Sequence, residues 1–150
     1  MSEYNFLGTI TNKIESQGRM KFPAKFRRGG DSAKNEPFVL VRGLDGCIRV
    51  YPEEEWVKIR QKLDKIDLSQ QKLRDFKRCF LTDVSEVTID AQGRIKISQN
   101  LLKFARIERS VIIHGMISYI ELWCPELFNK KLFEIEESFA EIAEGLNLEG

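Results

Sequence analysis

The sequence predicts an α+β fold in which two pseudo-symmetric halves share one core. An internal repeat is the first reason: residues 14–22 recur as residues 89–97, with Ile, Gln, Gly, Arg and Lys identical at five of the nine positions. Within each copy, basic and apolar residues alternate after the glycine, which is typical of a half-buried strand. Apolar residues at helical spacing follow later in each half. A repeat of this kind indicates two copies of one structural unit.

The repeated phrase predicts a tight turn followed by a strand. Gly18 and Gly93 supply a positive φ at little cost, which suits the turn. The period of two then places basic and apolar side chains on opposite faces. The basic face carries Arg19, Lys21, Arg94 and Lys96, and the apolar face carries Met20, Phe22, Ile95 and Ile97. Each half therefore presents a strand with a cationic outer face.

The other elements follow in the same order in both halves. Further strands are expected at 6–13, 38–41 and 48–51, and at 111–113 and 119–123. Pro23 begins a short helix, and Ser98 can cap its second-half counterpart. Pro52 and Pro125 each start a longer amphipathic helix, and residues 67–69 break the first one into two. Because one half has too few residues to bury its own strand faces, strands of the two halves should interleave.

These patterns divide the chain into four segments. The first unit spans 6–53, connecting helices span 54–81, the second unit spans 82–125, and a C-terminal helix with an acidic tail spans 126–150. The last helix has an apolar stripe formed by Leu127, Leu132, Ile135, Phe139 and Ile142. Such stripes usually face a core, but they can equally pack against a neighbouring chain.

Composition excludes several classes of protein. No apolar run approaches the ~18 residues that a membrane span needs, and the first residues do not resemble a signal peptide. Three widely spaced cysteines argue against a disulfide framework and favour a reducing cytoplasm. Metal-site and nucleotide-binding motifs are missing from the sequence, so we expect no metal and no cofactor.

Charge is distributed unevenly along the chain, although the net charge is +1. Residues 10–28 contain six basic side chains and one acidic one, whereas residues 125–150 contain seven glutamates and two lysines. The basic front is a candidate anion-binding surface, and the alternative is a role in solubility. For nucleic acid, Arg and Lys bind phosphates, and a bidentate Arg recognises guanine edges.

Catalytic interpretations are weaker. His114 with Cys47, Cys79 or Cys124 could form a nucleophilic pair in principle, but the thiols lie in apolar contexts. Glu15 and Asp90 could act as paired carboxylates, but capping of the turns or pairing with a nearby Arg explains them better. We therefore expect no enzymatic activity, and a hydrolase remains a rival hypothesis.

Several stretches together resemble the MraZ family. They are Phe6-Leu7-Gly8, the Gly18-Arg19 turn with Phe22-Pro23-Ala24-Lys25-Phe26-Arg27, the Phe38–Cys47 segment ending Arg-Gly-Leu-Asp-Gly-Cys, Tyr51-Pro52 with Trp56, and the second turn Asp90…Gly93-Arg94-Ile95. The resemblance covers residues from about 6 to 128. It departs from the family at Glu15, where Asp is usual, at Gln17 and Gln92, where a basic residue is frequent, and at Ser98, where Pro is common.

The resemblance implies two tandem AbrB-like swapped-hairpin units that form a double-psi-like β-barrel core with flanking helices. It also implies a homo-oligomeric ring of about eight to twelve subunits, which would multiply weak contacts. Such proteins bind short direct repeats in double-stranded DNA upstream of the division and cell-wall gene cluster. They act there as transcriptional regulators, typically repressors, and associate with the cytoplasmic nucleoid.

We accordingly predict a sequence-specific DNA-binding regulator. The residues expected to contact DNA are Arg19 and Lys21 first, Arg94 and Lys96 second, with Lys13, Lys25, Arg27 and Arg28 extending the surface. Glu15, Gly18, Asp90 and Gly93 are expected to shape the turns. The alternative is an AbrB-like protein-binding module of the antitoxin type, in which the acidic C-terminal helix captures a basic partner.

Overall fold

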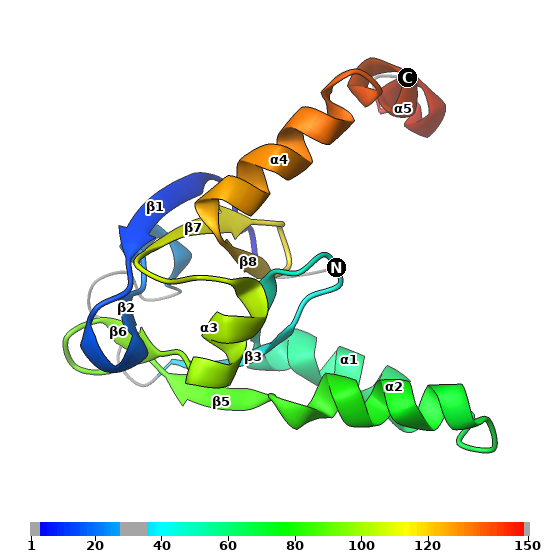
Figure 1. Ribbon diagram of the computed structural model, residues 1–150, viewed down its shortest axis with the longest axis horizontal. Helices are drawn as coiled ribbons and strands as arrows, with labels where there is room; N and C mark the ends of the chain where they lie inside the picture. Colours follow the sequence, from blue (N-terminus) through cyan, green and yellow to red (C-terminus); the bar gives the residue numbers. More distant parts are fainter. Residues whose placement is uncertain (1–3, 28–35, 149–150) are drawn as a thin grey trace.

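The computed structural model describes residues 4–27 and 36–148 (Figure 1). The strands are β1 (Thr9–Lys13), β2 (Arg19–Lys21), β3 (Pro37–Arg42), β4 (Ile48–Pro52), β5 (Ser85–Thr88), β6 (Arg94–Lys96), β7 (Ser110–Gly115) and β8 (Ile120–Trp123). The helices are α1 (Glu53–Asp64), α2 (Gln71–Thr82), α3 (Gln99–Ala105), α4 (Pro125–Glu136) and α5 (Phe139–Leu146), with short 3₁₀ turns η1 (Ser16–Gly18) and η2 (Ala24–Phe26).

The strands of the two halves interleave, as the repeat predicts. Six antiparallel strands form one sheet in the order β1-β7-β8-β4-β3-β5. Strand β1 of the first half pairs with β7 of the second, and β5 of the second half pairs with β3 of the first. The β4–β8 pair joins the halves at the middle of the sheet. Neither half could form this sheet alone.

A separate two-stranded ribbon, β2 with β6, also joins the halves. Its register sets Arg19 opposite Lys96, Met20 opposite Ile95, and Lys21 opposite Arg94. Since Arg94 and Lys96 are the repeat equivalents of Arg19 and Lys21, each half contacts the other through the same surface. This is the contact that two-fold symmetry requires.

The double-psi-like barrel is not confirmed. The six-stranded sheet is open, with β1 and β5 at its edges, and the β2–β6 ribbon is a sheet of its own. Backbone hydrogen bonds at the two turns connect the first residue of each ribbon strand to the acidic residue before its turn, from Glu15 N to Arg19 O and from Asp90 N to Arg94 O. What the structure supports is an antiparallel α+β fold with a ribbon placed against an open sheet.

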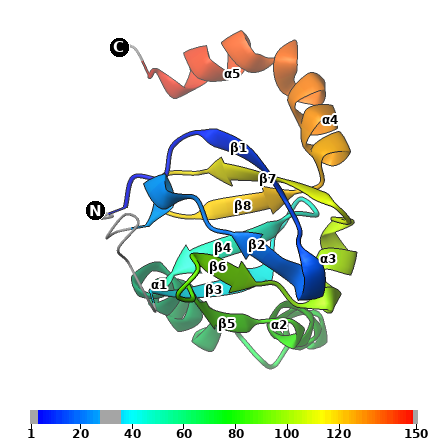
Figure 2. The same ribbon diagram turned by 90° about the vertical axis from the view of Figure 1, so that its left-hand side faces the viewer.

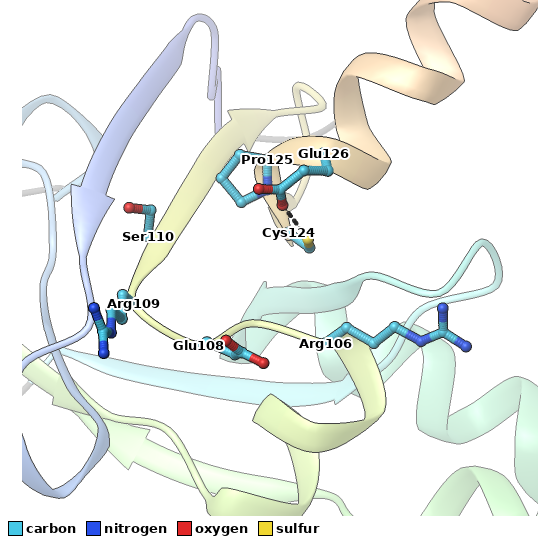
Figure 3. A pocket seen from close by; sticks show the side chains of 7 residues that line it. All are labelled: Arg106, Glu108, Arg109, Ser110, Cys124, Pro125 and Glu126. Carbon is cyan, nitrogen blue, oxygen red and sulfur yellow. Dashed lines mark hydrogen bonds between the residues drawn. The ribbon is translucent and has the colours of Figure 1, made fainter.

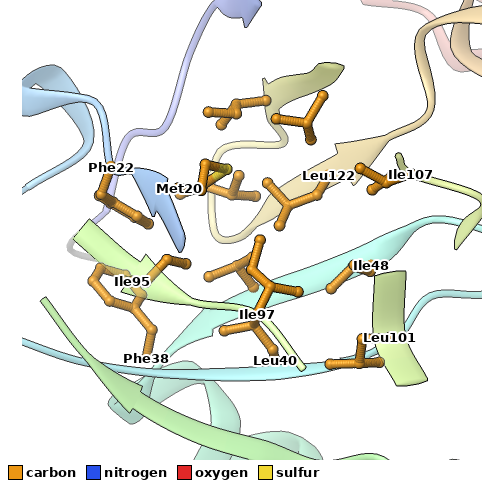
Figure 4. Close-up of a cluster of buried hydrophobic side chains, with 14 of the residues drawn as sticks. Met20, Phe22, Phe38, Leu40, Ile48, Ile95, Ile97, Leu101, Ile107 and Leu122 are labelled. Carbon is orange, nitrogen blue, oxygen red and sulfur yellow. The ribbon is translucent and has the colours of Figure 1, made fainter. Parts of the chain in front are cut away.

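The main core lies between the ribbon and one face of the sheet (Figure 4). The apolar side chains of the ribbon and the residues after it point inward and are fully buried, as the alternation predicts. They are Met20, Phe22, Ile95 and Ile97, and they meet Phe38, Leu40, Ile48 and Leu122 from the sheet. The N-cap of α3 closes one side, where the Leu101 N–H donates to Ser98 Oγ over 3.2 Å.

Helices cover parts of the opposite face of the sheet. Trp56 and Leu63 of α1 pack with Val39, Val41 and Tyr51 of the sheet in a second core. A third cluster forms where Phe128 of α4 contacts Cys47, Ile112 and Trp123. Helices α1 and α4 thus occupy corresponding places in the two halves.

The C-terminal helix predicted as one element is two, which corrects the sequence-based expectation. The apolar stripe runs on without a break, but helix α4 ends at Glu136 and α5 begins at Phe139. Helix α4 projects from the body and carries α5 at its far end (Figure 1). As a result, Leu132, Ile135, Phe139 and Ile142 of the stripe are exposed in the single chain.

Candidate nucleic-acid interface

The two Gly-Arg turns sit at the ends of the ribbon and have nearly equivalent backbone bonds. In the first turn the Gly18 N–H donates to Glu15 O over 3.2 Å, and in the second the Gly93 N–H donates to Asp90 O over 2.9 Å. Each glycine carbonyl then accepts from the other half: Ile97 N to Gly18 O is 2.8 Å and Phe22 N to Gly93 O is 2.9 Å. The turns therefore fix the position of the ribbon as well as its shape.

Both positions require glycine. Their φ angles are +76° at Gly18 and +80° at Gly93, in the region that L side chains avoid. A Cβ at Gly18 would lie 2.4 Å from the backbone oxygen of Ile97, and one at Gly93 would lie 2.8 Å from a guanidinium nitrogen of Arg27. The predicted turn glycines are thus needed for conformation and for close approach.

The ribbon gathers four cations on one exposed face. Figure 2 views the molecule from the side on which strands β2 and β6 lie. Directly paired residues of an antiparallel ribbon share a face. The register therefore places Arg19, Lys21, Arg94 and Lys96 together, while Met20 and Ile95 point into the core. Arg19, Lys21 and Lys96 are exposed and Arg94 is half-buried. We call these four side chains the ribbon cations.

Arg94 differs from Arg19 because it forms an ion pair. Its Nε lies 2.8 Å from Glu15 Oε2, and its second terminal nitrogen lies 3.0 Å from Glu15 Oε1. The pair joins the two halves. Hydrogen bonding from Arg94 lowers the pKa of Glu15 below its ordinary value, with smaller contributions from the charges of Arg94 and Lys21. Among the described residues, Arg19 has no side-chain ion pair or hydrogen bond.

Asp90, the repeat equivalent of Glu15, caps its own turn instead. Its Oδ1 accepts from the backbone N–H groups of Gln92 and Arg94, over 2.9 and 3.0 Å. The Arg94 N–H is the main reason that the pKa of Asp90 is lowered. Asp90 therefore stabilises its own turn, and Glu15 links the two ribbon strands through Arg94.

The structure spreads the remaining predicted cations over different environments. Lys13 is exposed at the end of β1, and Lys25 is exposed with its Nζ 5.5 Å from the ring centroid of Phe26. Arg27 is buried, with 9 % of the residue's surface exposed, and its Nε and one terminal nitrogen donate to Phe22 O. It supports the ribbon from inside instead of adding to the exposed cations. Arg28 lies outside the described residues.

The residues of the rival catalytic hypotheses make structural contacts. Burial raises the pKa of Cys47 to about 12, and the nearby Glu121 raises it further. His114 Nδ1 lies 2.9 Å from Thr9 Oγ1, and its ring packs against Phe128. Cys124 lines a pocket of about 360 Å³ at the start of α4, together with Arg106 and Arg109 (Figure 3). There its thiol donates to Glu126 Oε2 over 2.9 Å.

The described part of the chain contains neither a cluster of metal-binding side chains nor a helix that could span a membrane. Residues 4–27 and 36–148 bring no three His, Cys, Asp or Glu side chains into a metal-binding group. Within the same residues, no helix has both the length and the hydrophobicity that a membrane crossing needs.

Comparison with known proteins identifies the family. The family model described as "MraZ protein, putative antitoxin-like" matches the chain twice, over residues 5–79 and 80–149. The chain belongs to the MraZ family. The resemblance drawn from the sequence is thereby confirmed, and the two matches fall on the two halves. A relative in the MraZ family, "Transcriptional regulator MraZ" of Natranaerobius thermophilus, is 39% identical over 140 residues, which are 93% of this chain and 94% of that protein.

The expectation that Glu15 and Asp90 cap their turns or pair with a nearby Arg is confirmed, but sequence reasoning did not identify Arg94 of the other half as the partner of Glu15. A signal was present, since Glu15 stands where the second copy of the repeat has the shorter Asp90. An extra methylene lets the carboxylate reach beyond its own turn. Sequence reasoning also missed the burial of Arg27, because that position lies beyond the alternating segment and has no periodic signal.

Proposed function

We propose that this member of the MraZ family is a sequence-specific DNA-binding transcriptional regulator. In this proposal it represses transcription from short direct repeats upstream of the division and cell-wall gene cluster, as part of the nucleoid. The observation that carries the proposal is the set of ribbon cations on one exposed face, supported by the regulatory name of the Natranaerobius relative. Cations in a fixed arrangement suit phosphates and base edges.

Arg19 is the residue that we expect to contact DNA most directly. It is exposed at the start of β2, next to a rigid turn, and makes no competing ion pair within the described residues. A guanidinium can bind a guanine edge or a phosphate with two parallel hydrogen bonds. Lys21 and Lys96 would add phosphate contacts on either side, and Lys13 and Lys25 would extend the cationic surface.

One chain offers few cations, so the proposal includes assembly into a ring of about eight to twelve subunits, which multiplies the contacts. Helices α4 and α5 support this part. Phe133 is 77% exposed and Phe139 is 69% exposed, and large exposed apolar patches usually mark interaction sites. The acidic residues of these helices and of the break between them are Glu126, Glu134, Glu136, Glu137, Glu141 and Glu144.

Helix α2 is the complementary surface for α4 and α5. It contains no buried residue, exposes Phe76 and Leu81, and carries Lys72, Arg74, Lys77 and Arg78 against one acid, Asp75. Docking α4–α5 of one copy onto α2 of the next would pair opposite charges and cover both apolar faces. Such a head-to-tail contact closes into a ring when its rotation permits.

The test is a titration of the DNA upstream of the chain's own gene, with a random duplex of the same length as reference. Arg19→Ala should lose specific binding while keeping its fold and oligomeric state. Arg60→Ala, which removes an exposed arginine from α1 on the far side of the sheet, should bind as wild type does. Equal affinity of Arg19→Ala and wild type at moderate salt would refute the site.

The antitoxin-like description of the family favours one second candidate, a protein-binding module. In that case the acidic α4–α5 segment would capture a basic protein. The same titration separates the two functions, since a protein-binding module would not distinguish the upstream duplex from the random one. Any residual binding would then collapse with salt for both duplexes.

A further inference from the structure

Glu15 and Asp90 occupy equivalent places in the repeat but do different work. Asp90 stays within its own turn and accepts two backbone N–H groups, at 2.9 and 3.0 Å. Glu15 makes no side-chain cap on its turn, and the turn contains a left-handed residue, Gln17, with φ of +62°. The Glu15 carboxylate reaches across the ribbon to Arg94 instead.

The Glu15–Arg94 pair occupies one of the two forks through which the Arg94 guanidinium could bind DNA. Both carboxylate oxygens are engaged, Oε1 by Nε at 3.2 Å and by a terminal nitrogen at 3.0 Å, and Oε2 by Nε at 2.8 Å. The other terminal nitrogen donates to Gln92 O over 3.3 Å. A phosphate or guanine edge that approaches these same two donors must displace Glu15. A ligand that approaches the remaining N–H groups meets a guanidinium whose charge the Glu15 carboxylate already compensates.

Arg19 makes no such ion pair within the described residues, although, after the Arg94 backbone N–H, its charge contributes to the lowered pKa of Asp90. The equivalent partner would be Asp90, whose side chain is one methylene shorter and is held by its own turn. Among the described residues no carboxylate lies within ion-pair distance of Arg19. The two Gly-Arg turns therefore present guanidinium groups of different availability, although their backbones are nearly equivalent.

We infer that Glu15 restrains Arg94, so that the two turns of one chain contact DNA unequally. Arg19 binds directly, whereas Arg94 offers its paired donors and its full charge to DNA only when the Glu15–Arg94 pair opens. Glu15 is thus a positioning residue: by pairing with Arg94 it lowers DNA affinity and reduces the contribution of the second turn to binding. This inference rests on the proposed DNA-binding function and adds a non-equivalence that the repeat alone does not predict.

The consequence is measurable because the pair is exposed to solvent and weak. The Glu15 side chain is 41% exposed and that of Arg94 is 31% exposed. Opening an exposed pair of this kind costs about two- to fivefold in an equilibrium constant. A freed Arg94 that reaches one phosphate would also steepen the dependence of log K on log salt by about 0.9 for each contacting subunit.

The experiment compares Glu15→Gln and Glu15→Asp with wild type on the upstream duplex at several salt concentrations. Glu15→Gln removes the charge, whereas Glu15→Asp keeps it and shortens the reach, so that Asp can cap its own turn. Both should bind more tightly, by about two- to fivefold per contacting subunit, with the steeper salt dependence. Glu86→Gln, an exposed carboxylate on β5 in the pocket beside Trp56, is the charge control and should change little.

The double variant Glu15→Gln/Arg94→Gln decides whether the gain passes through Arg94. It should bind no better than Arg94→Gln alone. A gain that survives in the double variant, or no gain in either single variant, would overturn the inference while leaving the proposed function intact. Failure of the function itself has a different signature, since the wild type would then not distinguish the upstream duplex from the random one, and the inference would fall with it.

Discussion

Replacement of Gly18 by alanine tests whether the turns hold the two halves together. Gly46→Ala is a matched control, since Gly46 also has a positive φ, +84°, but a Cβ there would meet nothing within 4 Å. Both substitutions carry the left-handed cost, about 1 kcal/mol. At Gly18 the new Cβ would also lie 2.4 Å from Ile97 O, so the backbone must shift and strain the 2.8 Å bond from Ile97 N to Gly18 O.

The additional cost at Gly18 follows from those two contacts. A strained hydrogen bond costs about 1 kcal/mol and overpacking about 1–3 kcal/mol. We therefore expect Gly18→Ala to destabilise the chain by about 3–5 kcal/mol and Gly46→Ala by about 1 kcal/mol. For a chain of this size, each kcal/mol moves the unfolding midpoint by about 2–4 °C.

Urea unfolding followed by tryptophan fluorescence measures the difference, because Trp56 and Trp123 are both buried. The variants must be compared at one protein concentration, since assembly makes apparent stability depend on concentration. Equal losses in Gly18→Ala and Gly46→Ala would refute the reasoning. They would mean that the close approach of the two halves at the turn carries no energetic weight.

Three further outcomes are expected. Ile142→Glu should reduce the assembled mass in light scattering and Ile142→Val should not, because a charge cannot enter an apolar contact between copies; unchanged mass for Ile142→Glu would argue against α5 as an interface. Iodoacetamide at pH 8 should modify exposed Cys79 well before Cys47, whose pKa is raised to about 12 by burial, and mass spectrometry of the native protein checks the order. The pKa of Asp90 is lower in the folded chain than in the unfolded chain, where it is about 3.9, so the ionised carboxylate stabilises the fold above that pH. This stabilisation is lost as the pH falls through the pKa of the folded state. Asp90→Asn should therefore show a flatter fall of melting temperature between about pH 5 and pH 2 than wild type, and parallel curves would contradict the capping role.

Much of the fold could be predicted because the repeat and the alternation are local signals. The alternation Arg19-Met20-Lys21 identified the buried and exposed faces of β2, and the 3.2 Å cap at Ser98 follows from the type of residue before an apolar helix. Interleaving followed from the shortage of apolar partners within one half. Pairing of β2 with β6 in a separate ribbon was not specified, since alternation does not say which strands meet.

The parts that could not be predicted depend on contacts between segments distant in sequence. Glu15 and Arg94 are brought together by the ribbon register, which no local pattern encodes. The break between α4 and α5 at Glu137 and Ser138 interrupts an apolar stripe that is continuous in the sequence. Arg27 is buried because its guanidinium donates to Phe22 O beneath the turn. Nothing in the sequence distinguishes Arg27 from the other basic residues of that segment, so its burial could not be predicted.

Under the proposed function, the ribbon register also links DNA binding to the folding of the whole chain. Arg19 lies opposite Lys96 and Lys21 lies opposite Arg94, so each half supplies one arginine and one lysine to the ribbon cations. A single half would therefore present only two of the four cations and lack the Gly93 or Gly18 carbonyl that positions its strand. A ligand that recognises all four binds the folded chain and not the unfolded one, and so must stabilise it by mass action. Under the proposed function, operator DNA would raise the unfolding midpoint of wild type, and the rise would be small in Arg19→Ala, because the ligand's affinity and its stabilising effect come from the same contacts.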